Sequence, residues 1–146
     1  MLSNSCKYAI RAVIYTALHA DNIRKLGSKV IAEKLNIPHP FLAKILQDLT
    51  RKNLISSTKG PNGGFYLTPD NLKNSVLDIV TCIDGLEKFS QCFLGLHTCS
   101  NEKPCSVHSI VEPFKNELIL KLSNNTIAQF AKDIQSGNSY ISLEDN

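Results

Sequence analysis

Three cysteines and one histidine gather in one short stretch of this 146-residue chain, and their side chains are all able to bind a metal. Cys92, Cys99, Cys105 and His108 lie within seventeen residues and are separated by six, five and two residues. Thiolates and imidazole nitrogens are the ligands that proteins use for zinc and for iron–sulfur clusters. Because one loop of this length can fold around one centre, we predict that these four residues bind a metal or a cluster.

Cysteines also serve as core residues or form disulfides. Free cysteine is common in protein cores, but the segment from residue 91 to residue 106 is mostly polar and contains glycine and proline, so it is a poor place to bury thiols. The chain has five cysteines, an odd number, and no apolar signal segment at its amino terminus, which indicates a reducing cytoplasm where stable disulfides are rare. We therefore favour ligation at the loop and expect Cys6 and Cys82, which lie in apolar helical patterns, to be core residues.

The spacing also bears on the kind of metal. Structural zinc sites usually hold their ligands in close pairs, two to four residues apart, and here only Cys105 and His108 form such a pair. Wider gaps suit an iron–sulfur cluster, whose ligands are mainly thiolates and in which histidine can replace a cysteine. The sequence thus favours iron and leaves zinc as the alternative.

The two halves of the chain carry opposite charge. Residues 1–73 have eleven Lys or Arg against four Asp or Glu, a net charge of +7, and residues 74–146 have five against nine, a net charge of −4. The basic half suits a polyanion such as DNA. No stretch approaches the apolar length of a membrane span, so we expect no membrane partner.

Three helices are predicted in the basic half. Residues 6–20 carry apolar side chains at helical spacing, and Ser28 is a candidate cap for a short second helix that ends before Pro38. The tight connection to a third helix, at about residues 39–52, is typical of a helix-turn-helix. One face of this third helix is apolar and is expected to join the core: Phe41, Leu42, Ile45, Leu46 and Leu49.

The opposite face of the third helix is free to enter a DNA groove. Lys44 and Gln47 lie in its amino-terminal turns, where such helices meet base edges. Two strand-like segments, residues 54–58 and 65–67, then flank a turn-rich segment at 59–64, which predicts a β-hairpin that contacts DNA as a wing. A phosphate-cradling nucleotide loop is disfavoured, since the Walker and dinucleotide spacings are absent. The predicted DNA-contacting residues are Ser28, Lys29, His39, Pro40, Ala43, Lys44, Gln47, Arg51, Lys59, Gly60, Pro61, Asn62 and Gly63.

The acidic half is predicted to contain a helix over residues 76–83, the cysteine loop, a long amphipathic helix and a short last helix opened by Thr126 and Gln129. The long helix has no obvious partner in so short a chain, so we expect it to pack on its copy in a homodimer, whose two-fold symmetry implies palindromic DNA sites. Completion of the chain's own core is the alternative. The predicted dimerisation residues are Val107, Val111, Phe114, Leu118 and Leu122.

Together these patterns predict a mainly α fold with a small β-hairpin wing. Residues 1–73 would form a winged helix-turn-helix DNA-binding domain, and residues 74–146 the cluster-binding loop and a long C-terminal dimerisation helix. No nucleophile, base and orienting group stand together, and no Cys-x-x-Cys pair is present, so we do not expect an enzyme.

On these motifs the chain resembles the Rrf-two family of winged-helix transcription regulators, which includes IscR-like and NsrR-like members. The resemblance rests on residues 8–12, the wing at 59–67, the segment 126–130 and the cysteine loop. It implies a bacterial, cytoplasmic DNA-binding homodimer with an iron–sulfur cluster on Cys92, Cys99 and Cys105. In this family the redox state, nitrosylation or loss of the cluster alters DNA binding.

The fourth ligand separates the types within this resemblance. In IscR-like members a histidine shortly after the third cysteine completes a [2Fe–2S] site, and His108 matches it. In NsrR-like members an acidic residue near the amino terminus of the partner subunit completes a [4Fe–4S] site, whereas residues 5–8 here contain no carboxylate. The resemblance favours a [2Fe–2S] cluster over a [4Fe–4S] cluster, and the alternative function is a zinc-stapled or thiol-based winged-helix regulator without a cluster.

Overall fold

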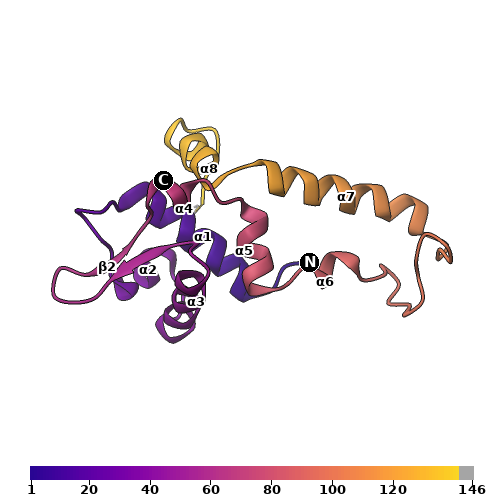
Figure 1. Cartoon of the computed structure of the whole chain (residues 1–146), viewed down its shortest axis with the longest axis horizontal. Coiled ribbons are helices and arrows are strands. Elements are labelled where there is room, and N and C mark those ends of the chain that lie inside the picture. The colour runs from indigo at the N-terminus through magenta and orange to yellow at the C-terminus, as the bar shows by residue number, and fades with distance from the viewer. Residues whose placement is uncertain (142–146) are drawn as a thin grey trace.

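The computed structural model describes residues 1–141 and shows a largely helical protein with one small antiparallel hairpin, as predicted (Figure 1). In chain order the elements are α1 (Asn4–His19), α2 (Ser28–Leu35), α3 (His39–Arg51), β1 (Ser56–Thr58), β2 (Gly64–Tyr66), α4 (Pro69–Leu72), α5 (Val76–Ile83), α6 (Glu87–Ser90), α7 (His108–Asn124) and α8 (Ile127–Gln135). Within the described range, no helix is both long and apolar enough to cross a membrane.

Helix α1 lies at the centre of the fold. The side chain of Ser3 caps it by accepting a hydrogen bond from the backbone N–H of Cys6. Its apolar residues recur at helical spacing, and α1 contacts α2, α3, α5 and α8. The main core joins Ile79 of α5 and Ile127 of α8 to the buried residues of α1, α2 and α3, so the core includes residues from both charged halves.

The helix-turn-helix is formed by α2, a left-handed Asn36 and α3. Asn36 has φ +52° and ends α2 two residues before Pro38, which is the capping residue of α3. The prediction that Ser28 caps α2 was wrong. Gly27 is the capping residue, and Ser28 is the first residue of the helix. Phe41 was expected in the core and is 62% exposed, whereas the other four residues of that face are buried.

The predicted wing is present as the hairpin β1–β2, in which Ser57 pairs with Phe65. A side chain at Gly63 would place its Cβ 2.3 Å from the carbonyl oxygen of Thr58, so the tight turn needs glycine there. Phe65 also pairs with Leu26, in the loop between α1 and α2. The basic segment before α2 therefore lies against the wing.

The elements after the wing are fixed by local caps. Thr68, Ser75 and Thr126 each form a capping box, at the starts of α4, α5 and α8. A second apolar cluster joins Cys6, Val76, Val80 and Phe89, with Leu118 and Leu122 of α7 packed against it. Helix α7 contacts α5 but has no fully buried residue along its seventeen, and Figure 1 shows it extending away from the helices around α1.

Candidate metal centre and nucleic-acid interface

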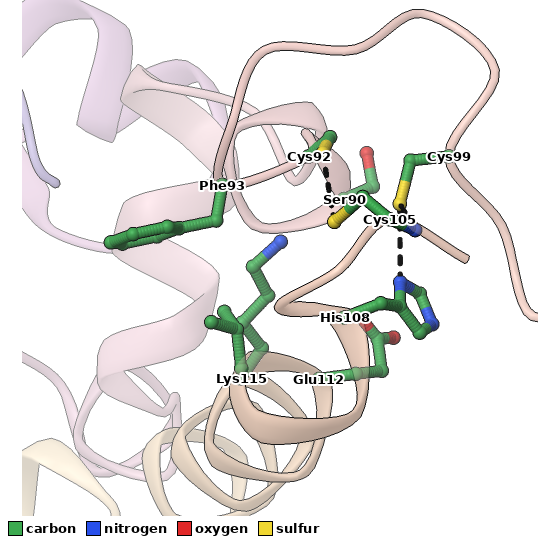
Figure 2. A pocket seen from close by; sticks show the side chains of 9 residues that line it. Ser90, Cys92, Phe93, Cys99, Cys105, His108, Glu112 and Lys115 are labelled. Carbon is green, nitrogen blue, oxygen red and sulfur yellow. Dashed lines mark hydrogen bonds between the residues drawn. The ribbon is translucent and has the colours of Figure 1, made fainter.

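The three loop cysteines converge at the amino-terminal end of α7, as Figure 2 shows. Their sulfur atoms all lie within 4.8 Å of one another, and Cys92 Sγ is 3.7 Å from Cys105 Sγ. All three cysteines are partly exposed and none forms a disulfide. Three thiols at this separation can bind one metal ion or one cluster.

Short turns in the loop bring the sulfur atoms together. The backbone N–H of Gly95 bonds to the carbonyl oxygen of Cys92, and Gly95 has φ +74°, which favours glycine. Ser100 and Lys103 close a second turn through two hydrogen bonds. This second turn reverses the chain between Cys99 and Cys105, so that the backbone N–H of Cys105 donates to Cys99 Sγ at 3.4 Å.

His108 is the first residue of α7 and lies beside one cysteine of the group. Its Nδ1 atom is 3.3 Å from Cys99 Sγ. The set of ligand atoms that are all within 4.8 Å of one another contains the three cysteines but not His108. The other ring nitrogen, Nε2, is 2.9 Å from Oδ1 of Asn101. His97, in the same loop, lines a hollow on another side of Cys92 and Cys99.

The thiols of the centre differ in acidity. Backbone N–H groups of Leu96 and Leu94 stabilise the thiolate of Cys92 and, with its neighbouring thiols, lower its pKa to about 7. At Cys99 the backbone N–H of Cys105 acts in the same direction, but burial and the neighbouring sulfur atoms outweigh it and raise the pKa. Since a metal binds thiolates, Cys92 is the thiol of this pair that most readily offers its sulfur near neutral pH.

A second, small hollow is lined by the three cysteines and His108, and three polar residues that the sequence analysis did not identify also line it: Ser90, Glu112 and Lys115. The ammonium group of Lys115 donates a hydrogen bond to the carbonyl oxygen of Gln91, directly before Cys92. Glu112 and Lys115 lie four and seven residues after His108 on α7, and Figure 2 shows both close to it. That helical spacing was the available signal, because positions i, i+4 and i+7 share one face.

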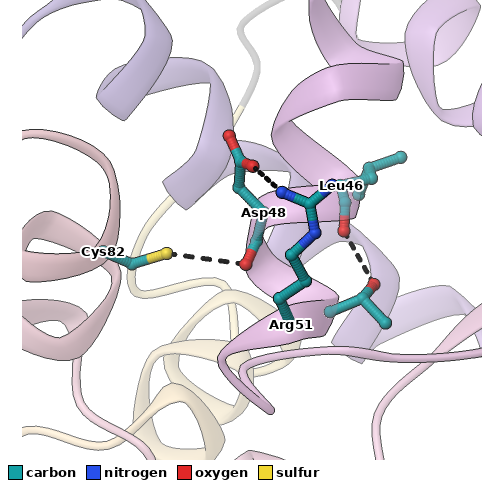
Figure 3. Close-up of polar contacts among 5 residues, drawn as sticks. Leu46, Asp48, Arg51 and Cys82 are labelled. Carbon is teal, nitrogen blue, oxygen red and sulfur yellow. Dashed lines mark hydrogen bonds and ion pairs between the residues drawn. The ribbon is translucent and has the colours of Figure 1, made fainter.

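The solvent face of α3 carries exposed polar residues: Lys44, Gln47 and Arg51 are exposed, with Pro40 beside them. Arg51 pairs with Asp48 at 3.3 Å. On the inner side, Cys82 Sγ of α5 lies 3.7 Å from the backbone oxygen of Asp48, which Figure 3 shows as a contact between the two helices. One face of α3 thus contacts α5, and the face that carries Lys44, Gln47 and Arg51 is exposed to solvent.

The remaining predicted DNA-contacting residues lie on α2, on α3 and in the wing. Ser28 Oγ is 2.9 Å from Nε2 of His39, which links the starts of α2 and α3, and Ala43 is half-buried. Lys29 and residues 59–62 of the wing are exposed, and Gly63 is half-buried. Lys25, which was not among the predicted residues, also lies beside the wing: its ammonium is 5.3 Å from the centre of the Tyr66 ring. The pairing of Leu26 with Phe65 brings the neighbouring Lys25 to the wing, and this pairing between distant segments is not visible in the sequence spacing.

The residues predicted for dimerisation lie on different sides of α7. Phe114 is 70% exposed, whereas Val111, Leu118 and Leu122 are half-buried, and Val107 is the residue before the helix. Leu118 and Leu122 pack on the second apolar cluster of their own chain. Ile110, which the sequence analysis did not include, is 63% exposed and lies one turn from Phe114. These two side chains give α7 an uncovered apolar surface.

A helix-turn-helix followed directly by a two-stranded hairpin defines a winged-helix DNA-binding protein. Solved structures agree with this class. The chain superposes on the global cysteine regulator CymR (YrzC) of B. subtilis with a TM-score of 0.71, at 18% identity over 90% of this chain and 96% of that one. It superposes equally well on T. potens IscR, with a TM-score of 0.71 and 23% identity over 100% and 96% of the two chains.

Residues 2–133 match the model of the Rrf2 family, described as an iron-dependent transcriptional regulator, and the chain belongs to this Rrf2 (Rrf-two) family. An HTH-type transcriptional regulator of Aquifex aeolicus is 35% identical over 81% of this chain and 82% of that protein. The HTH-type transcriptional regulator IscR of Yersinia pseudotuberculosis is 24% identical over 90% of this chain and 79% of its own length. The chain is thus a transcriptional regulator of the winged-helix class.

Proposed function

We propose that this regulator binds operator DNA under the control of an iron–sulfur cluster held by Cys92, Cys99, Cys105 and His108. The observation that carries the proposal is the convergence of three thiols within 4.8 Å on the loop that leads into α7. The iron-dependent description of the family and the similarity to IscR proteins support it. The oxidation, nitrosylation or loss of the cluster would then be the signal.

The donor set fits such a group. Three thiolates and one imidazole are a known ligand set for iron–sulfur clusters, and Nδ1 of His108 already lies beside Cys99. We favour a [2Fe–2S] cluster, since the chain resembles IscR-like members in having a histidine shortly after the third cysteine, and that histidine completes a [2Fe–2S] site in those members. A zinc-stapled or thiol-based regulator is the second candidate, because the same fold occurs in a protein described as a global cysteine regulator.

The chain's own contacts suggest how the centre could affect DNA binding. Phe89 of α6, just before the loop, packs on Val76 and Val80 of α5, and Cys82 of α5 contacts α3. Ligation would order the loop and fix α6 and α7 against α5, and thereby the position of α3. A coupling of about 1–3 kcal/mol between the two sites would change DNA affinity roughly 5- to 150-fold.

The regulator is proposed to act as a homodimer on a palindromic operator. Its location would be the bacterial cytoplasm, because that compartment contains the chromosomal DNA. Pairing of two α7 helices through the surface around Ile110 and Phe114 would place two α3 helices on successive half-sites. Residues 1–73 would contact the DNA, with Lys44 and Gln47 of α3 in the major groove and Lys59 to Gly63 of the wing along the backbone.

The test is an anaerobic purification with visible absorption, iron, sulfide and zinc measured on one sample, followed by operator binding before and after iron removal. A coloured protein with iron and sulfide, and an affinity that changes when the cluster is removed, would support the proposal. Cys92→Ala should abolish both effects, while the matched control Cys82→Ser, which keeps a donor for Asp48, should preserve them. A colourless protein with one zinc would support the second candidate.

A further inference from the structure

We propose that Asn101 is a positioning residue that makes Nδ1 of His108 the metal-binding nitrogen. The inference rests on the proposed function, because it concerns the same centre. His108 has one ring nitrogen on each side: Nδ1 is 3.3 Å from Cys99 Sγ, and Nε2 is 2.9 Å from Oδ1 of Asn101. One side of the ring thus faces the thiols, and the other faces an amide oxygen.

The amide oxygen decides where the ring proton resides. A neutral imidazole carries one N–H, on either Nδ1 or Nε2, and a carbonyl oxygen only accepts hydrogen bonds. The contact with Oδ1 of Asn101 therefore stabilises the tautomer with its proton on Nε2. In this tautomer Nδ1 presents a lone pair toward Cys99, which is the form that binds a metal.

Hydrogen bonds of neighbouring residues hold the backbone next to both Asn101 and His108. Asn101 lies in the turn that Ser100 and Lys103 close, where Lys103 N is 3.2 Å from Ser100 Oγ. The backbone N–H of His108 donates to the carbonyl oxygen of Cys105 at 3.1 Å. The contact between Asn101 and His108 consequently joins the tip of the loop to the start of α7.

The tautomer can be measured in the metal-free protein, without reference to a cluster. Long-range proton–nitrogen NMR spectra at a pH where His108 is neutral should show the proton on Nε2 in the wild type. Asn101→Leu, which has a side chain of similar size without the acceptor, should shift the ring proton toward Nδ1. Asn101→Asp, which keeps an acceptor oxygen, should leave the proton on Nε2. A proton on Nδ1 in the wild type, or a tautomer indifferent to Asn101→Leu, would overturn the inference.

The consequence for the centre is tested after anaerobic reconstitution with ferrous iron and sulfide. Loss of such an outer hydrogen bond typically weakens metal binding about 10- to 100-fold, so a chelator should remove iron from Asn101→Leu faster by about this factor. Asn101→Asp should retain iron like the wild type and lower the reduction potential, since a carboxylate makes the ring a stronger electron donor. The matched control is Glu102→Leu, an exposed neighbour that should leave both quantities unchanged.

The two proposals fail in different ways. A wild-type protein that takes up neither iron nor sulfide would refute the cluster, and the NMR measurement would still decide the role of Asn101. A wild-type protein that holds the cluster, together with an Asn101→Leu variant that holds it equally well at the same potential, would refute the positioning role alone.

Discussion

Ser3 and Asp84 connect the start of α1 to the end of α5. The backbone N–H of Ser3 lies 2.9 Å from Oδ2 of Asp84, and the Ser3 hydroxyl donates to Oδ1. The Asp84 side chain is only 4% exposed and pairs with Lys88 at 3.3 Å. Because Ser3 also caps α1, this one carboxylate holds α1 next to the segment that leads into α6 and the cysteine loop.

Replacing Asp84 with alanine should destabilise the fold, because it leaves two donors of Ser3 without their acceptor in a partly buried place. The expected loss in the free energy of unfolding is about 1–3 kcal/mol, measured by urea denaturation. Asp70→Ala is the matched control: Asp70 pairs with Lys73 at 3.4 Å but is 91% exposed, so its loss should cost less than about 1 kcal/mol. Equal losses in the two variants would contradict the structural role of Asp84.

The carboxylate of Asp84 should also make the free energy of unfolding depend on pH in the acidic range. Burial alone would raise the pKa of Asp84, but hydrogen bonds from Ser3 and the ammonium of Lys88 more than offset it, so the pKa lies below its ordinary value of 3.8. Since the folded-state pKa is lower than the unfolded-state pKa, the stabilisation is complete above the ordinary value and disappears as the pH falls through the folded-state value. Asp84→Asn should therefore be less stable than the wild type at neutral pH. The difference between their free energies of unfolding should become smaller below about pH 4. Urea titrations at several pH values give this difference.

Sequence patterns anticipated the helices and the hairpin but not which faces are covered. Phe41 repeats at helical spacing with Ile45, so the pattern assigned both to the core, yet only Ile45 is buried. Periodicity gives the direction of a side chain, whereas burial needs a neighbouring element. At this end of α3 no described element covers Phe41, which instead lines an open groove of about 500 Å³ beside Ile83.

The centre shows a similar limit. Residue type and spacing were sufficient to predict that Cys92, Cys99 and Cys105 meet, since three thiols in one polar loop are typical of ligands that share a metal or a cluster. The positions of Asn101 and Lys115 depend instead on the turn at Ser100 and on how α7 is rotated relative to the loop. The rotation of α7 is a tertiary feature, so helical spacing alone could place Lys115 on the face of His108 but not at the loop. Asn101 lies in a local turn, where a single polar residue in a polar loop gives no signal of its own.

In the metal-free protein, the rate of alkylation should distinguish the loop cysteine Cys92 from the core cysteine Cys6. The pKa of Cys92 is lowered to about 7, chiefly by the backbone N–H groups of Leu96 and Leu94, while burial raises the pKa of Cys6 to about 12. Cys92 should therefore react with iodoacetamide with a midpoint near pH 7, and Cys6 should stay unmodified in the folded protein. Peptide mass spectrometry after timed alkylation distinguishes the two sites. Rapid modification of Cys6 under native conditions would show that α1 and α5 are not packed as described.

Two residues on the open face of α3 should affect DNA binding in different ways. Gln47→Ala should relax the preference for one operator base and cost about 1–3 kcal/mol, whereas Lys44→Ala should weaken all sequences alike and reduce the salt dependence by about one phosphate contact. Titrations of operator and scrambled DNA at several salt concentrations measure both effects. Lys132→Ala on α8, which removes the same charge outside the proposed interface, should change neither.

A charge on the uncovered surface of α7 should break the proposed dimer. Phe114 is 70% exposed and Ile110 is 63% exposed one turn away, so Phe114→Glu would place a carboxylate where two apolar surfaces are expected to meet. Sedimentation equilibrium should then show a monomer with unchanged helical circular dichroism and weaker binding to a two-site operator. Ile23→Glu is the matched control for the sedimentation and circular dichroism measurements, since Ile23 is 85% exposed in the loop after α1 and lies outside α7. A dimer that survives Phe114→Glu would place the interface on another surface and remove the geometric reason for a palindromic operator.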